Sequence, residues 1–512
     1  MKGTLQLINN SEYAVCAQIL RLFFGHCSRE GDSLVFPLSA EQIAGTTDGV
    51  SITVSSDYMV DSEELTALRY GTTLVEDLPN AKARIEINLR AERLLKSSCQ
   101  TNLSDFRRNL KRELYLVLST WTGISFPWGS LTGVRPTQIC AEIMELCGRE
   151  EAVKILTDEW GLSQDKAELG TKVGKAEKGI ISRYDPDKDY VVYCGLPFCP
   201  TRCRYCSFTT RDANRYADKL ELYVEAMLEE AGQFFGRQSG KAAAVYFGGG
   251  TPTSLPADLF AYYTKGLLEL IPHNADAELT MEAGRPDTLN DEILNLIKDA
   301  GFGRLCINPQ TMHDSSLNAI GRKHTAADTL AAYELARKTG SFIINMDLIY
   351  GLPGEKPGDF LSSLERVLDL APENITLHSL ALKQSARLMD DMSGHDLQTY
   401  LREIHPDLLL EQELNEAYMR LQHNSYPPYY LYKQKRSRGA LENTGFSKPG
   451  YESTYNVLMM SDRFTVIGLG SGATSKFLTA SGLVRQHNSK DLLDYINRVP
   501  EFVNKKLELK SF

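Results

Sequence analysis

The sequence predicts an α/β fold: a partial (β/α)6 barrel with an N-terminal α+β domain and a mainly helical C-terminal cap. From Tyr190 onward, short apolar segments alternate with segments of helical length, which is typical of a parallel sheet covered by helices on both faces. Polar motifs follow directly after several of these apolar segments. Parallel β/α proteins place their chemistry at the carboxyl ends of strands, so the same edge of the sheet is expected to carry the site.

The region before the barrel divides into two parts. Residues 1–125 are expected to form a small α+β domain, and residues 126–188 a helical linker that ends at the Asp185-Pro-Asp-Lys-Asp189 breaker. Within the first part, strand-like pieces occur at 3–8, 49–54 and 83–89, and a helix is expected over 103–121. The helix is amphipathic because Phe106, Leu110, Leu114 and Leu118 share one face.

The barrel itself is expected over residues 189–388, followed by the C-terminal cap over 389–512. Its six predicted strands are 190–195, 242–247, 277–283, 304–308, 343–350 and 374–380. The intervening segments have helical length.

The composition argues against several classes of function and structure. The chain has 512 residues with 42% hydrophobic and 24% charged residues, which is ordinary for a soluble globular protein. A net charge of −10 argues against a nucleic-acid binder driven by bulk charge. Ten cysteines without a paired framework argue against a disulfide scaffold and for a reducing cytoplasm. No apolar run reaches the length of a membrane span or resembles a signal peptide.

Three cysteines are the most informative feature of the chain. Cys199, Cys203 and Cys206 lie four and then three residues apart, directly after the first predicted barrel strand. Such a loop can hold three corners of a [4Fe–4S] cube and leave the fourth iron free for a small molecule. Structural zinc is the alternative, but it takes four ligands and usually shows a second ligand pair farther along the chain, which this sequence lacks.

Several further motifs accompany the cysteines in order. They are Gly248-Gly-Gly-Thr-Pro252, Arg285-Pro-Asp287 after Glu282, Gln310, Gly321-Arg322 and Asp347-Leu-Ile-Tyr-Gly-Leu-Pro353. With the cysteine loop they resemble the oxygen-independent coproporphyrinogen III oxidase family of radical S-adenosylmethionine (SAM) enzymes. Within it, the chain is most similar to the HemZ-type coproporphyrinogen dehydrogenase branch. The resemblance covers roughly residues 190 to 480 and implies a radical-SAM barrel.

The resemblance also implies a set of ligands. It assigns the [4Fe–4S] cluster to the three cysteines and SAM to a group of residues around them. These expected SAM contacts are Tyr193, Tyr205, Gly249, Gly250, Thr251, Glu282, Gln310, Arg322, Asp347 and Ala381. Independently of the resemblance, glycines after a strand allow close approach of a ligand to the backbone, although alone they are weak evidence.

The expected reaction is the oxygen-independent oxidative decarboxylation of coproporphyrinogen III to protoporphyrinogen IX. The resemblance implies a tetrapyrrole substrate and an electron donor such as flavodoxin or ferredoxin. Decarboxylating relatives carry a further cysteine where this chain has Phe208, so a haem-binding or haem-trafficking protein of the same family is the alternative. Tyr455 replaces a histidine of that haem-chaperone branch. Another radical SAM modification of a tetrapyrrole is a third possibility.

Other polar segments are less informative. Residues 429–438 hold three tyrosines beside Lys433, Lys435, Arg436 and Arg438. They are interpreted either as an exposed charged stretch or as aromatic walls and cations for a tetrapyrrole with several carboxylates. His324 and His378 are expected to be structural residues with satisfied ring nitrogens, and the glycines at 468, 470 and 472 to form a turn.

Overall fold

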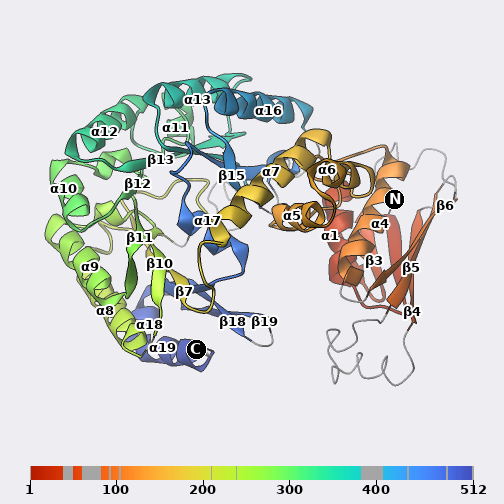
Figure 1. Ribbon diagram of the computed structural model, residues 1–512, viewed down its shortest axis with the longest axis horizontal. Helices are drawn as coiled ribbons and strands as arrows, with labels where there is room; N and C mark the ends of the chain where they lie inside the picture. Colours follow the sequence, from red (N-terminus) through yellow and green to blue (C-terminus); the bar gives the residue numbers. More distant parts are fainter. Residues whose placement is uncertain are drawn as a thin grey trace. The chain divides into compact units, whose positions relative to one another are not determined.

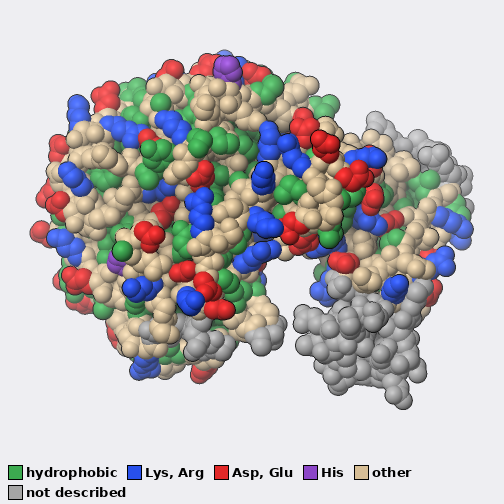
Figure 2. Space-filling model, in the orientation of Figure 1, with side chains coloured by type: hydrophobic (Ala, Val, Ile, Leu, Met, Phe, Trp, Pro, Cys, Tyr) green, Lys and Arg blue, Asp and Glu red, His purple; other side chains and the backbone are tan. Residues whose placement is uncertain are grey.

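The computed structural model describes residues 2–38, 50–59, 82–91, 94–102, 105–208, 210–237, 239–381, 407–434, 437–479 and 482–509. They form two compact units, and the boundary between Thr171 and Lys172 falls inside helix α7 (Gln164–Ile181). This boundary lies within the expected linker, and the domain borders at 125, 188 and 388 remain predictions. None of the described helices is long and apolar enough to cross a membrane. Acidic and basic side chains are interspersed on the visible face (Figure 2).

The first unit is built on a sheet with the strand order β2-β3-β1-β4-β5-β6. Its elements are β1 (Lys2–Ile8), α1 (Tyr13–Phe24), β2 (Ser28–Glu30), β3 (Ser33–Pro37), β4 (Ser51–Met59), β5 (Lys82–Arg90), β6 (Leu94–Asn102) and α4 (Phe106–Thr122). Side chains alternate between buried and more exposed along β5, and the buried set packs against α1 and α4. Helices α5 (Pro136–Cys147) and α6 (Arg149–Asp158) follow.

The second unit contains the predicted run of parallel strands. In sheet order these are β7 (Asp189–Leu196), β10 (Lys241–Gly249), β11 (His273–Glu282), β12 (Arg304–Cys306), β13 (Ile343–Tyr350) and β14 (Asn374–Ser379). The main connecting helices are α8 (Leu220–Phe235), α9 (Ala257–Leu270), α10 (Asp291–Asp299), α11 (Asp314–Ala319), α12 (Ala326–Thr339) and α13 (Asp359–Leu370), and they follow the outside of the curved sheet (Figure 1). The partial barrel is therefore confirmed.

The C-terminal region differs from a mainly helical cap, because it also contributes strands. β16 (Glu442–Ser447) and β15 (Pro428–Lys433) extend the sheet beyond β14 in antiparallel register. At the other edge, β17 (Thr465–Leu469) runs parallel to β7 and is followed by β18 (Thr474–Thr479) and β19 (Gly482–His487). The helices of this region are α16 (Leu408–His423), α17 (Thr454–Ser461), α18 (Leu492–Asn497) and α19 (Val499–Glu508). Both edges of the parallel sheet are thereby paired.

Helix α17 packs against the inner side of the curved sheet. Its buried residue Tyr455 shares an apolar cluster with Val191 of β7 and Ala244 of β10. Glu278 of β11 caps the helix, accepting hydrogen bonds from the backbone N–H of Tyr455 at 3.1 Å and from two groups just before it. The carboxylate at a helix N-terminus is stabilised by the helix dipole. Arg304 of β12 completes the cap, with Nη2 3.1 Å from Glu278 Oε2.

A buried ion pair ties α19 to the barrel. Lys506 of α19 and Glu230 of α8 are both fully buried and in contact. Glu230 also accepts hydrogen bonds from Tyr495 at 2.6 Å and from the backbone N–H of Gly470 at 2.9 Å, and Lys506 donates to the Gly468 carbonyl at 2.6 Å. Gly468 lies within β17, so the expected glycine turn comprises only Gly470 and Gly472. Gly468 and Gly470 are held by a satisfied polar network, which is what a buried charge requires.

Candidate functional site

The cysteine loop leaves the carboxyl end of β7. It begins with β8 (Phe198–Cys199), which pairs with β9 (Arg211–Asp212), and the backbone N–H of Ala213 donates to the Cys199 carbonyl at 2.9 Å. Between these short strands the chain turns tightly, with the N–H of Cys206 donating to the Cys203 carbonyl at 3.2 Å. The pairing of β8 with β9 therefore brings the two ends of the cysteine loop together.

The three thiols are partly buried and close enough to influence one another. The pKa of Cys199 is raised to about 12, mainly by burial, with smaller raising contributions from the neighbouring Cys203 and Cys206. Burial likewise raises the pKa of Cys206. Placing several thiolates together in such surroundings is unfavourable unless a positive centre compensates them, and a cluster of iron ions supplies that charge.

The donor set fits a cubane cluster. No three of the His, Cys, Asp and Glu side chains in the described ranges meet closely enough to hold a single metal ion. A [4Fe–4S] cube does not require this, because each thiolate binds a different corner. Cys199, Cys203 and Cys206 would hold three corners, and the cluster would supply low-potential electrons to a small molecule at the fourth.

The glycine-rich segment after β10 lies directly against the cysteine loop. The N–H of Gly250 donates to the Leu196 carbonyl at 2.6 Å, and the N–H of Thr251 donates to the Phe198 carbonyl at 2.7 Å. The Thr251 hydroxyl lies 3.5 Å from Cys199 Sγ. A Cβ at position 250 would approach the Phe198 carbonyl oxygen to 2.3 Å, so only glycine fits there. Backbone hydrogen bonds therefore fix the position of the glycine-rich segment relative to the cysteine loop.

A carboxylate faces this junction from the next strand. Glu282 ends β11, and Oε2 accepts a hydrogen bond from the N–H of Gly249 at 3.3 Å. The pKa of Glu282 is raised from 4.5 to about 7, mainly by burial and secondly by the charge of Asp347. Tyr193 lies alongside, its ring stacked on Tyr246 at 6.2 Å between centroids. The structure thus brings the predicted Tyr193, Gly249 and Glu282 together.

Arg322 is buried on the other side of the cysteine loop. Nη1 donates to the carbonyl oxygens of Gly284 at 3.0 Å and Asn308 at 2.6 Å, and Nη2 lies 3.5 Å from the hydroxyl of Tyr205. Nε has no hydrogen-bond partner within the described residues. A buried guanidinium with a donor to spare suits an anionic group such as a carboxylate.

Gln310 adopts a backbone conformation that side chains rarely take. Its φ is +68°, and it is held there by a hydrogen bond from its N–H to the Asp347 carbonyl at 2.9 Å and one from the Ile349 N–H to its own carbonyl at 2.8 Å. Such left-handed residues outside glycine are uncommon and frequently mark functional sites. Ala381, the last expected SAM contact, forms an isolated bridge with Ser437.

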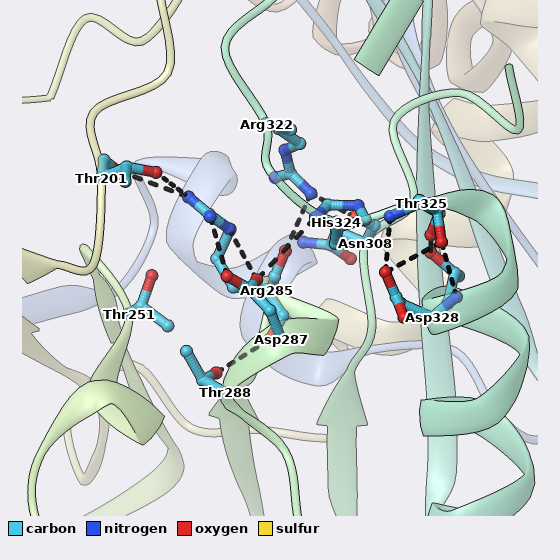
Figure 3. A network of polar contacts seen from close by, with 12 residues as sticks. Thr201, Thr251, Arg285, Asp287, Thr288, Asn308, Arg322, His324, Thr325 and Asp328 are labelled. Carbon is cyan, nitrogen blue, oxygen red and sulfur yellow. Dashed lines mark hydrogen bonds and ion pairs between the residues drawn. The ribbon is translucent and has the colours of Figure 1, made fainter. Parts of the chain in front are cut away.

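Arg285 connects the cysteine loop to the strand ends, a role that the sequence did not reveal. Nη1 donates to the Thr201 hydroxyl at 3.0 Å and to the Thr201 carbonyl at 3.4 Å, while Nε and Nη2 form a two-point ion pair with Asp287 at 3.0 Å each (Figure 3). The sequence signal was the Arg-Pro-Asp motif alone. The partner Thr201 lies 84 residues away in the chain.

Of the two histidines, His324 differs from expectation. His324 is buried, yet neither ring nitrogen has a hydrogen-bond partner within the described residues, and Nδ1 lies 3.8 Å from Asp287 Oδ1. The pKa of His324 is lowered to about 4, mainly by burial and secondly by the charge of Arg322, so the ring is neutral at pH 7. The expectation of satisfied ring nitrogens is therefore wrong for His324. His378 contacts two polar side chains, described below.

The segment at 429–438 is only partly described. Tyr429 and Tyr430 are buried in β15 and pack with Ile180 and Val457, and Lys433 is also buried. The described part is therefore not an exposed charged stretch. Positions 435 and 436 lie outside the described residues, as does the side chain at 438.

Phe208 and Tyr455 stand where the two branches of the resembled family are expected to carry a cysteine and a histidine, respectively. Phe208 follows the third cysteine and is 59% exposed. Tyr455 is buried in α17, with its ring stacked on Tyr246 at 4.6 Å between centroids.

Comparison with known proteins places these features in context. Residues 193–367 match the family model described as the radical SAM superfamily. The Bacillus subtilis (strain 168) protein "Oxygen-independent coproporphyrinogen-III oxidase-like protein HemZ" is 34% identical over 410 residues, covering 78% of this chain and 80% of that protein. "Heme chaperone HemW" of Lactococcus lactis is 27% identical over 319 residues, covering 60% and 74%. The solved coproporphyrinogen III oxidase (HemN) from Escherichia coli aligns with a TM-score of 0.47 and 23% identity, covering 64% of this chain and 72% of that one.

Proposed function

The chain belongs to the radical SAM superfamily and to its oxygen-independent coproporphyrinogen III oxidase-like family, and from this membership we propose that it decarboxylates coproporphyrinogen III oxidatively, without oxygen, to protoporphyrinogen IX. Its cofactors are a [4Fe–4S] cluster and SAM. The observation that supports an enzyme is the junction of the cysteine loop with the Gly249–Thr251 segment, where thiols, backbone N–H groups and Glu282 meet.

The residues have distinct proposed tasks. Cys199, Cys203 and Cys206 hold the cluster, and Gly249, Gly250 and Thr251 approach the methionine part of SAM. Arg322 offers its spare Nε donor to the SAM carboxylate. Tyr193, Tyr205, Glu282, Gln310, Asp347 and Ala381 complete the SAM pocket.

The proposed reaction balances as follows. When bound, the cluster and SAM supply a 5′-deoxyadenosyl radical, which takes one hydrogen atom from the β-carbon of a propionate side chain. An electron donor of the flavodoxin or ferredoxin class would supply the one electron that SAM cleavage consumes. The substrate radical then loses carbon dioxide and passes one electron to a separate one-electron acceptor. A vinyl group remains. A second propionate is processed in the same way.

A second candidate is a haem-binding or haem-trafficking protein. The exposed Phe208 favours it, because decarboxylating relatives carry a cysteine at this place. The position of Tyr455 does not favour axial haem ligation through that side chain, because its ring is buried in a stack with Tyr246. Another radical SAM modification of a tetrapyrrole is the third candidate.

The test is an anaerobic reaction of the full chain, reconstituted with iron and sulfide, with SAM, a strong reductant and coproporphyrinogen III. Mass analysis of the products separates the candidates. Vinyl product with 5′-deoxyadenosine supports the proposal, whereas 5′-deoxyadenosine without vinyl product rejects decarboxylation. Stoichiometric haem binding with neither product favours the carrier.

Two serine variants provide a matched control. Cys203→Ser should lose both cluster and activity, whereas Cys147→Ser should keep both, because Cys147 is an exposed thiol in α5. Equal loss in the two variants would show that the thiol set has been misassigned.

A further inference from the structure

Three side chains from three strands form a chain of contacts at the carboxyl edge of the sheet. Nε2 of His378, on β14, lies 3.4 Å from Oδ2 of Asp347 on the neighbouring strand β13. Nδ1 of the same ring lies at hydrogen-bond distance, 3.4 Å, from the hydroxyl of Tyr432 on β15. His378 therefore joins a carboxylate and a phenol through its two ring nitrogens.

The direction of the contacts follows from the protons available. Burial raises the pKa of Tyr432 to about 12, so the phenol keeps its proton at neutral pH. The Gln434 side chain hydrogen-bonds to the phenol and lowers that pKa, as a donor to its oxygen does. Tyr432 then donates its own proton to Nδ1 of His378. The ring proton is left on Nε2, facing Asp347, because the partner of one ring nitrogen sets the tautomer.

Few polar contacts other than the one with His378 orient the Asp347 side chain. Its side chain is 23% exposed, and the contact with His378 is its only ion pair or hydrogen bond recorded among the described residues. The charge of Asp347 raises the pKa of Glu282, so the two acids lie close enough for their charges to interact. A carboxylate meant to accept hydroxyl groups of a ligand needs a fixed rotamer, and a donor on one oxygen provides it.

We propose that His378 and Tyr432 are positioning residues for SAM, which fix Asp347 through one oxygen and leave the other for the ligand. This inference rests on the proposed role of Asp347 as a SAM contact. It makes strand β15, from the C-terminal region, a part of the SAM site. The sheet extension beyond β14 then has a functional reason, because without β15 the ring of His378 would lose the partner that sets its tautomer.

The test measures the dissociation constant of SAM for the cluster-loaded full chain, without tetrapyrrole, by anaerobic equilibrium dialysis. His378→Phe removes both contacts and should raise Kd by about ten- to thirtyfold, the effect of one lost hydrogen bond to a charged group. His378→Gln can retain a donor near the position of Nε2 and should restore most of the affinity. Tyr432→Phe should raise Kd about threefold, and should add nothing in the His378→Phe background.

Tyr430→Phe is the matched control, because Tyr430 is buried on the same strand and its ring stacks on Tyr432. It should leave Kd unchanged. In the SAM-cleavage reaction without tetrapyrrole, His378→Phe should raise KM for SAM with little change in kcat, and every variant should bind four irons. If His378→Phe fails to load the cluster, Tyr432→Phe and His378→Gln carry the test.

Three results would overturn the proposal: an unchanged Kd in His378→Phe or in Asp347→Asn, an equal effect of Tyr430→Phe and Tyr432→Phe, or a further effect of Tyr432→Phe when the histidine is absent. Failure of the decarboxylation proposal is recognised separately. In that case no vinyl product forms, while these SAM affinities are unaffected because tetrapyrrole is absent from the measurement.

Discussion

Replacing Arg285 by methionine is expected to release the cysteine loop. Of the four hydrogen bonds that this guanidinium donates, two go to Asp287, only two residues away, and two reach Thr201 in the loop. The contact with the Thr201 carbonyl is long, at 3.4 Å, so we count one full bond. A hydrogen bond to a charged group contributes about 2 kcal/mol, which corresponds to a roughly thirtyfold shift toward the open loop.

The assay is the rate at which the reconstituted cluster loses iron to an anaerobic chelator, followed by its visible absorbance. If loop opening precedes iron loss, Arg285→Met should lose iron up to about thirtyfold faster than the wild type, by the same estimate. Thr201→Val removes the hydroxyl contact, which is the bond counted here, and should approach the same acceleration. Removing any paired arginine can lower the stability of the fold. A second arginine variant, away from the cysteine loop, is therefore needed as a control.

Arg337→Met is that control. Nη2 of Arg337 donates to both carboxylate oxygens of Glu373, at 3.0 and 2.9 Å, near the amino ends of the strands rather than at the cysteine loop. It should lower the stability of the fold without changing the rate of iron loss. Equal rates in Arg285→Met and the wild type, or equal acceleration in Arg337→Met, would refute the reasoning.

Three further expectations follow from other parts of the second unit. In the cluster-free protein, the folded state of Glu282 holds its proton up to about pH 7, whereas the unfolded chain releases it near 4.5. The free energy of unfolding should therefore fall, relative to Glu282→Gln, as pH rises from 4.5 to 7, and parallel pH profiles in urea titrations would contradict this. Gly250→Ala should reduce iron content, because its Cβ would meet a backbone oxygen at 2.3 Å, whereas Gly179→Ala, with open space around it, should not. Lys506→Met should lower the free energy of unfolding by about 3 kcal/mol, because it leaves the buried Glu230 unpaired. The double variant with Glu230→Met should recover part of that loss in chemical denaturation, because Tyr495 and the Gly470 N–H then lack their acceptor, and no recovery would show that the pair is not the cause.

The sequence identified the barrel strands well because each is a short apolar run bounded by turns. The predicted strand over 343–350 coincides with β13, and the one over 190–195 lies within β7. The strands at the sheet edges were missed. A short run such as Tyr429-Tyr-Leu-Tyr432 fits a strand or a buried helix segment equally by periodicity, and only its pairing with β16 decides between them.

The candidate site likewise combines features that the local sequence contains and contacts that only the structure shows. Thiol spacing and the glycine run are local features, so a sequence alone contains them, and the structure places Cys199 and Thr251 in contact. It also groups Tyr193, Gly249 and Glu282 as expected. The roles of individual residues toward SAM remain predictions.

By itself, the sequence determined which chemical groups are available and at which ends of the parallel strands they stand, because period and spacing are properties of neighbouring residues. Only the tertiary structure decided which groups meet. Arg285 contacts Thr201, 84 residues away in the sequence, and His378 contacts Tyr432, 54 residues away. Such partners are chosen by strand order and register, which depend on the packing of the whole sheet rather than on any local pattern.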